Sequence, residues 1–164
     1  MKTLEWWGGR GYRFHPKVSF VLTNHNMSAQ TCSIVNDLRQ FGDAEIIVID
    51  DGSEHGHTKT VVDHLSGVNE FVLHFNDLFD VIVFNRAFGF AQGEYIVVLQ
   101  DDDYYKGTTW IEKAVEWFDR DRSLAALGGR YDVHVSQSGE HEFSGQGDPR
   151  YAQAVNAAPM WFRR

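Results

Sequence analysis

Tyr95-Ile96-Val97-Val98-Leu99-Gln100-Asp101-Asp102-Asp103 is the stretch from which the rest of the chain can be interpreted. Its first five residues form an unbroken apolar run, which is typical of a strand buried on both faces of a sheet. Three consecutive carboxylates then follow the end of that strand. Because ligands bind beyond the carboxyl ends of parallel strands, the stretch predicts both a core strand and a polar site.

The same pattern of a buried strand followed by polar residues occurs earlier in the chain. Further strands are predicted at Val18–Leu22, Glu45–Ile49 and Phe71–Phe75. Helical spacing of apolar residues predicts helices from an N-cap at Ser28 to Gly42, over residues 58–65, and over Trp110–Phe118. Residues 78–92 fit both periods, and the helix is favoured. Strands that alternate with helices predict an α/β fold with a mostly parallel sheet and right-handed crossovers.

The two ends of the chain have weaker patterns. Residues 1–15 mix glycine with aromatic residues without any periodicity and are predicted to be an irregular N-terminal arm. Residues 16–164 are predicted to form one domain, which suits the length of 164 residues. Short strands are possible at Leu124–Leu127 and Tyr131–Val135, followed by a polar loop around residues 139–149.

Composition excludes several classes of protein. Twenty-three acidic residues against fifteen basic ones give a formal net charge of −8, which is unsuited to a nucleic-acid partner. No apolar run is long enough for a transmembrane segment, and the start of the chain has no signal-peptide pattern, so a cytoplasmic location is expected. The single cysteine, Cys32, excludes an internal disulfide and is predicted to be a buried thiol.

Polar residues follow three of the four predicted strands: Thr23–Asn26, Asp50–Ser53 and Gln100–Asp103. The mutual repulsion of three adjacent carboxylates is most simply offset by a hard divalent cation. A solvated acidic loop or a helix N-cap is the alternative for Asp101–Asp103, and an ordinary Asp-Gly turn is the alternative for Asp51-Gly52. A zinc site at His55, His57 and His64 is disfavoured because no cysteine accompanies these residues.

Four motifs in a fixed order carry a family resemblance. Pro16–Asn26 and Ile47–Ser53 resemble the first two strands of the inverting glycosyltransferase family 2, and Asn85–Ile96 resembles the helix and glycine turn before its DxD motif. Asp101–Asp103 falls where the DxD motif belongs. The resemblance covers roughly residues 16–120 and implies the Rossmann-like GT-A fold for nucleotide-diphospho-sugar transferases.

The resemblance also implies roles for individual residues. The residues expected to bind the nucleotide are Thr23, His25, Asn26, Asp51, Arg86 and Asp101. Asp102 and Asp103 are the expected ligands of a divalent metal, Mn²⁺ or Mg²⁺. His25 stands where the family often has an aromatic ring on the base. Gln100 stands where an acid is common, and Val83-Phe84 replaces a basic residue before Asn85.

The resemblance therefore implies a glycosyltransferase that binds a nucleotide-diphosphate sugar, with a UDP-sugar as the expected donor. It is expected to transfer the sugar with inversion to a hydroxyl of a glycan, lipid or protein. Residues 151–164 resemble the family's strand just before its acceptor loop. In the family the catalytic base comes after that loop. We therefore expect the C-terminal acceptor subdomain to be absent, the chain to be truncated, and transfer to be weak. Among the late acids Asp132, Glu140, Glu142 and Asp148, none is assigned as the base. The alternative is a nucleotide-sugar-binding module without turnover.

Overall fold

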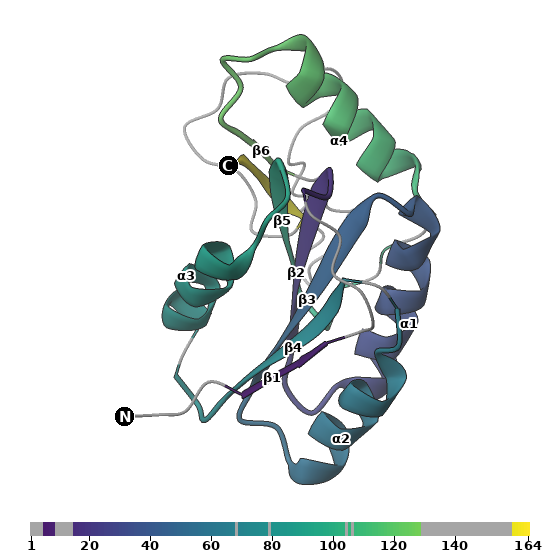
Figure 1. Cartoon of the computed structure of the whole chain (residues 1–164), viewed down its shortest axis with the longest axis vertical. Coiled ribbons are helices and arrows are strands. Elements are labelled where there is room, and N and C mark those ends of the chain that lie inside the picture. The colour runs from purple at the N-terminus through teal and green to yellow at the C-terminus, as the bar shows by residue number, and fades with distance from the viewer. Residues whose placement is uncertain are drawn as a thin grey trace, which may run out of the picture.

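The computed structural model describes residues 5–8, 15–67, 69–78, 80–103, 105, 107–128 and 159–164. Within these residues the chain forms one sheet of seven strands with helices on both faces (Figure 1). The strands are β1 (Glu5–Gly8), β2 (Val18–Asn24), β3 (Ala44–Asp51), β4 (Glu70–Phe75), β5 (Tyr95–Leu99), β6 (Ala126–Gly128) and β7 (Met160–Arg163). The helices are α1 (Ser28–Leu38), α2 (His55–His64), α3 (Asp80–Phe90) and α4 (Thr109–Arg120), with a 3-10 turn η1 (Arg39–Phe41) after α1.

The sheet has the strand order β1-β4-β3-β2-β5-β7-β6. Its four central strands, β4, β3, β2 and β5, are parallel, as the alternation of strands and helices predicted. β1 and β7 pair antiparallel with β4 and β5 on either side of this core. In register, Asn24 pairs with Asp50 and Leu22 with Leu99, so the ends of β2, β3 and β5 meet at one edge.

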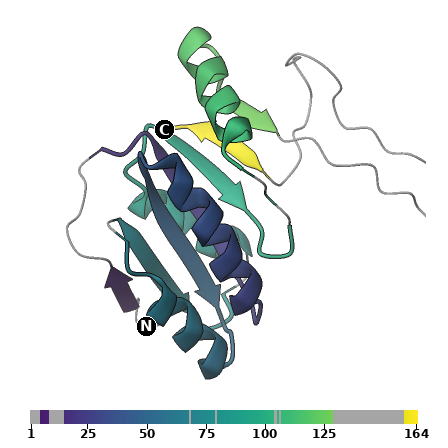
Figure 2. The same ribbon diagram turned by 90° about the vertical axis from the view of Figure 1, so that its right-hand side faces the viewer.

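Both faces of the central strands are covered, which explains why these strands are apolar without alternation. α1, α2 and α4 lie over one face, while α3 lies over the other (Figures 1 and 2). On β2, Phe20 and Leu22 pack into the core under α1 and α4, whereas Val21 packs into the core under α3. α3 buries Val83 and Ala87 at helical spacing, Ala91 is buried just after its end, and the preference for a helix over residues 78–92 is confirmed.

The ends of the first helical segment show one correct and one wrong prediction. Gly42 ends it as predicted, with a φ of 79° that a side chain would strain. Ser28, however, is the first residue of α1 rather than its N-cap, which is Met27 and makes no side-chain capping bond. The Ser28 hydroxyl instead contacts Nδ1 of His57, 2.9 Å away on α2. That contact between two helices cannot be read from local sequence.

The N-terminal arm is the main correction to the fold. Residues 5–8, predicted as irregular, form strand β1 and pair with β4 from Glu5↔His74 to Gly8↔Phe71. An edge strand depends on a partner distant in sequence, which periodicity alone does not reveal. Residues 131–135 and the loop at 139–149 lie outside the described residues. No described helix is long and apolar enough to cross a membrane.

Cys32 is only partly buried against the core, so the predicted buried thiol is an overstatement. Burial nevertheless raises the pKa of its thiol above the ordinary value, with the nearby Arg39 acting in the opposite direction. A raised pKa leaves little thiolate at neutral pH, and a reactive role for this cysteine has no support.

Candidate functional site

A pocket of about 390 Å³ opens at the carboxyl ends of the central strands. The residues that line it are Thr23, Asn24, His25, Met27, Ile49, Asp51, Asp77, Val83, Gln100, Asp101 and Asp102. They come from the ends of β2, β3 and β5, from the segment after β4, and from α3. Five of the eight predicted site residues therefore meet in one cavity, although the chain places them up to 79 positions apart.

Asp101 ties the end of β5 to the end of β2. One of its carboxylate oxygens accepts a hydrogen bond from the backbone N–H of His25 at 2.7 Å. The other accepts one from the Thr23 hydroxyl at 3.2 Å. Both bonds go to an ionised acceptor, which makes them stronger than neutral ones. Asp101 thus shapes the pocket wall that carries His25.

Asp102 and Asp103 point to different environments. Asp102 is exposed, lines the pocket and makes no hydrogen bond or ion pair within the described residues. Asp103 does not line the pocket, and its carboxylate accepts a hydrogen bond from the Tyr105 hydroxyl at 2.9 Å. Burial raises the pKa of Tyr105 above its ordinary value, so this hydroxyl stays protonated and remains a donor. Of the two predicted metal ligands, only Asp102 faces the cavity.

The donor set suits a divalent cation that is shared with a phosphate ligand. Among the described side chains, no three of His, Cys, Asp or Glu form a ready cage for a metal ion. Such a cage is not required, because Mg²⁺ in phosphate sites is held by one or two carboxylates together with phosphate oxygens and water. Asp102, with Asp101 beside it, offers hard oxygen ligands of this kind.

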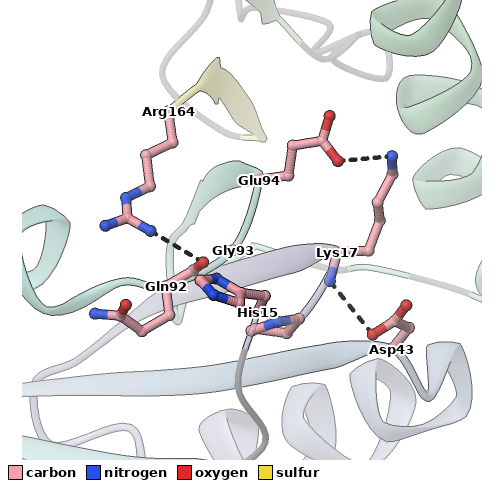
Figure 3. Close-up of a pocket in the computed structure, with 8 residues that line it drawn as sticks. His15, Lys17, Asp43, Gln92, Gly93, Glu94 and Arg164 are labelled. Carbon is pink, nitrogen blue, oxygen red and sulfur yellow. Dashed lines mark hydrogen bonds and ion pairs between the residues drawn. The ribbon is translucent and has the colours of Figure 1, made fainter.

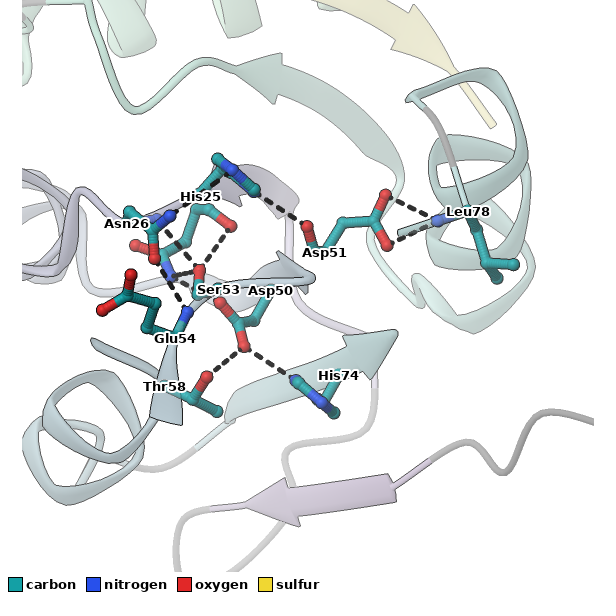
Figure 4. A network of polar contacts seen from close by, with 10 residues as sticks. His25, Asn26, Asp50, Asp51, Ser53, Glu54, Thr58, His74 and Leu78 are labelled. Atoms are coloured by element: carbon teal, nitrogen blue, oxygen red, sulfur yellow. Dashed lines mark hydrogen bonds and ion pairs between the residues drawn. The ribbon is translucent and has the colours of Figure 1, made fainter. Parts of the chain in front are cut away.

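His25 and Asp51 are joined across the ends of β2 and β3 (Figure 4). Nδ1 of His25 lies 3.0 Å from the backbone carbonyl oxygen of Asp51. A carbonyl oxygen can only accept, so Nδ1 carries the proton and the ring is held at the pocket wall. The Asp51 carboxylate accepts the backbone N–H of Leu78 at 2.9 and 3.0 Å through its two oxygens. This bond fixes the segment after β4 against the end of β3.

Asp50 is fully buried beneath the pocket and accepts hydrogen bonds from three side chains. Nδ2 of Asn24 donates at 2.6 Å. The Thr58 hydroxyl and Nδ1 of His74 each donate at 2.7 Å (Figure 4). Asn24 in turn accepts a bond from the Thr31 hydroxyl. A buried carboxylate is tolerated when its oxygens are satisfied in this way. The network links β2, β3, β4, α1 and α2 under the candidate site.

Two predicted nucleotide-binding residues, Asn26 and Arg86, do not line the cavity. The side-chain oxygen of Asn26 accepts the backbone N–H of Glu54 at 2.8 Å and so supports the start of α2. Arg86 is exposed on α3, with its guanidinium 6.0 Å from the centre of the Phe75 ring. Neither residue lines the pocket.

Six lining residues had not been predicted as site residues: Asn24, Met27, Ile49, Asp77, Val83 and Gln100. Asn24 and Gln100 belong to the polar strand ends that the sequence indicated. Met27, Ile49 and Val83 are apolar, and their patterns indicated only packing or a loop. Asp77 follows β4, the one predicted strand after which no polar site segment was predicted. The sequence Asn76-Asp77 after Phe75 was the available signal.

A second cavity of about 480 Å³ lies at the amino ends of β2 and β5, away from this site (Figure 3). Its charged groups largely satisfy one another. Nζ of Lys17 lies 2.9 Å from carboxylate oxygens of both Glu94 and Asp119, and Arg164 donates to the Gln92 carbonyl at 3.0 Å. These interactions indicate a structural role at that edge of the sheet.

The described part of the chain thus combines an open, mostly parallel α/β sheet with an acidic pocket at its carboxyl edge, the arrangement of nucleotide-binding α/β proteins. The sequence model for glycosyl transferase family 2 matches residues 19–153, which is more than three quarters of the chain. The chain belongs to this family. No curated protein sequence gave a match.

Solved structures show the same fold at low sequence identity. S. aureus TarS 1-349 is 18% identical with a TM-score of 0.65, and the match covers 90% of this chain and 47% of that one. Mannosyltransferase PcManGT from Pyrobaculum calidifontis is 17% identical with a TM-score of 0.59, covering 76% and 38%. Glucosyl-3-phosphoglycerate synthase from Mycobacterium tuberculosis is 16% identical with a TM-score of 0.57, covering 69% and 43%. The chain spans less than half the length of each of these three proteins.

Proposed function

We propose that the chain is the donor-binding part of a glycosyltransferase. In this proposal it binds a nucleotide-diphosphate sugar together with a divalent cation and passes the sugar to an acceptor hydroxyl with inversion. The observation that carries the proposal is the single pocket in which Thr23, His25, Asp51, Asp101 and Asp102 meet. Membership of glycosyl transferase family 2 supports the reaction class.

The structures of similar proteins support this choice of ligand. PcManGT was solved in complex with GDP-Man and Mn²⁺, and TarS in complex with UDP-GlcNAc. The glucosyl-3-phosphoglycerate synthase was solved with UDP and either Mn²⁺ or Mg²⁺. By analogy, the ligand of this chain is a nucleotide-diphosphate sugar, and its acceptor is an unidentified hydroxyl of a glycan, lipid or protein.

In the proposed arrangement the base lies toward the ends of β2 and β3, with the His25 ring and Asp51 beside it. The diphosphate lies toward the end of β5. Asp102 would hold a divalent cation there, with Asp101 beside it, and the cation would neutralise charge on the leaving diphosphate. Asp103 is the second expected ligand, and reaching the cation would require it to leave Tyr105.

Removal of the proton from the acceptor hydroxyl is a separate step, and we assign it to none of these residues. We assign no catalytic base among the described residues. Asp132, Glu140, Glu142 and Asp148 lie outside them. Donor binding and sugar transfer are therefore distinct properties that require separate assays.

The test is calorimetric titration of the chain with UDP and GDP, with and without Mn²⁺. Asp102→Asn should weaken the Mn²⁺-dependent part of binding at least about tenfold, because an amide is a poor substitute for a charged metal ligand. Asp63→Asn is the matched control, since Asp63 is exposed on α2 and, among the described residues, pairs only with the exposed Lys59. Absence of Mn²⁺-dependent binding, or equal losses in both variants, would overturn the proposal. A transfer assay then separates an enzyme from a binding module.

A further inference from the structure

Asp77 stands in an unusual place next to the base end of the pocket. It follows β4, lines the cavity, and has a φ of 54° in the left-handed region. Within the described part of the chain no hydrogen bond or ion pair involves its carboxylate. Aspartate and asparagine adopt this conformation more readily than other residues with a side chain, but it is still uncommon. Strained residues of this kind concentrate at ligand-binding sites.

The position of Asp77 is set by contacts on both sides of it. The backbone N–H of Gly52 donates to the Phe75 carbonyl at 3.1 Å, and the backbone N–H of Leu78 donates to the Asp51 carboxylate. Gly52 itself has a φ of 81°, and a Cβ built on it would lie 3.3 Å from Cβ of Asp77. The Asp51-Gly52 turn and Asp77 are therefore in close contact, and both aspartates line the same pocket.

Carboxylates are the acceptors that β3 and β4 bring to this end of the pocket, whereas the lining residues with side-chain donors, Thr23, Asn24 and Gln100, belong to β2 or follow β5. Asp51 and Asp77 supply carboxylates, whereas no Lys or Arg is among the described lining residues. The Nδ1 proton of His25 is already used by the Asp51 carbonyl oxygen. A base that fits must therefore present donors to these two acids.

Nucleobases differ in this respect. Uracil offers a single N3–H donor between two carbonyl oxygens, and a second carboxylate beside it would face one of these oxygens. Guanine offers adjacent N1–H and 2-amino donors. We propose, on the basis of the proposed function, that the donor carries guanine. In this assignment Asp51 accepts from N1–H and Asp77 accepts from the 2-amino group, in place of the UDP-sugar expected from the sequence.

The spacing of the sheet is compatible with this assignment. Asp77 follows β4 and Asp102 follows β5, and three strand intervals separate these strands in the order β4-β3-β2-β5. At about 4.8 Å per interval the strand ends are roughly 14 Å apart. An extended nucleoside diphosphate can reach from one to the other, with its base at Asp77 and its phosphates at Asp102.

The experiment compares GDP, inosine 5′-diphosphate and UDP by calorimetric titration of the chain with Mn²⁺. Inosine diphosphate lacks only the 2-amino group of guanine. We expect GDP to bind at least about tenfold more tightly than either of the others, because each lost bond to a carboxylate is a charged one. In Asp77→Asn, which keeps the backbone preference, the ratio between GDP and inosine diphosphate should fall to about one- to threefold.

A second variant, Asp77→Gly, also tolerates the left-handed backbone and should lower the same ratio. Thermal unfolding of both variants checks that the fold is retained, and Asp63→Asn should leave the ratio unchanged. Mn²⁺-dependent binding of UDP as tight as that of GDP would overturn this inference and leave the proposed function standing. An unchanged ratio in both Asp77 variants would overturn it as well. Failure of all three nucleotides to bind would overturn the proposed function and the inference together.

Discussion

The Asp101 carboxylate accepts the backbone N–H of His25 at 2.7 Å, across 76 positions of the sequence. Through this bond Asp101, the first residue of the acidic triplet, becomes part of the pocket wall that holds the His25 ring. Asp102, its neighbour, makes no such bond within the described residues and faces the cavity. The two adjacent aspartates therefore differ in their surroundings: Asp101 shapes the pocket wall, and Asp102 is the residue proposed to hold a cation.

Asp101→Asn should lower the free energy of unfolding by about 1–2 kcal/mol, because the charged acceptor of the bonds from His25 and Thr23 is lost. Asp102→Asn should leave stability within about 0.5 kcal/mol of the wild type, as for other surface substitutions. Urea denaturation at neutral pH measures both values. A larger loss in Asp102→Asn than in Asp101→Asn would contradict the division of roles.

His25→Ala should weaken binding of the free nucleoside as well as that of its diphosphate, since His25 is assigned to the base. Loss of a stacked ring costs roughly 1–3 kcal/mol per base, or about fivefold to 150-fold in affinity. Asp102→Asn should spare the nucleoside and weaken only the diphosphate with Mn²⁺. Titrations with both ligands check this pattern, and equal nucleoside affinity in His25→Ala and wild type would show that the ring does not contact the base.

Asp50→Ala should destabilise the chain by about 3–5 kcal/mol, because it leaves donors of Asn24, Thr58 and His74 without their acceptor in a buried network. Asp63→Ala is the matched control and should cost less than about 1 kcal/mol, since its ion pair with Lys59 is exposed. Chemical denaturation gives both numbers. Comparable costs in the two variants would show that the network contributes little.

Gly93→Ala should destabilise the fold by about 2 kcal/mol or more, because the added Cβ would lie 2.6 Å from the backbone nitrogen of Ser19. Gly89→Ala is the control: it lies within α3 and its Cβ would meet nothing within 4 Å. This second variant should stabilise the chain by up to about 1 kcal/mol through helix propensity. Thermal unfolding of both proteins would reveal opposite shifts, and a gain in Gly93→Ala would disprove the close packing of β2 against this turn.

The ion pair between Glu70 and Arg39 makes the free energy of unfolding depend on pH in the acidic range. Burial acts to raise the pKa of the Glu70 carboxyl, but the hydrogen bond from Arg39 at 2.6 Å and the backbone N–H groups of Gly67 and Ser66 lower it below the ordinary value of 4.5. Because the pKa of Glu70 is lower in the folded state, its ionised carboxylate stabilises the fold at pH values above 4.5. This stabilisation is lost as the pH falls through the pKa of the folded state.

Glu70→Gln should therefore be less stable than the wild type at pH 7, and the difference should shrink as the pH falls below about 4.5. Glu116→Gln removes an exposed pair with Arg120 at 3.8 Å and serves as the control. Denaturation midpoints from pH 7 to pH 3 measure the effect. A difference that stays constant over this range would rule out the proposed linkage.

Local sequence was sufficient for the central architecture. The apolar runs predicted β2, β3, β4 and β5, and helical spacing predicted α1 to α4, including α3 over the ambiguous residues 78–92. The polar residues after β2, β3 and β5 identified the edge that carries the pocket. These features follow from the sequence because a strand that is buried on both faces of a parallel sheet consists of consecutive apolar residues.

Tertiary structure decided what depends on partners distant in sequence. β1 exists because β4 offers an open edge, and Ser28 turns from its helix end to His57. Asn26 supports the start of α2 and Asp103 contacts Tyr105, and neither residue lines the pocket. Asp77, which had no predicted role, does line it. The sequence by itself determined which residue types stand at the strand ends. Their directions were decided by hydrogen bonds between segments, because each polar group takes the best partner that folding brings within reach.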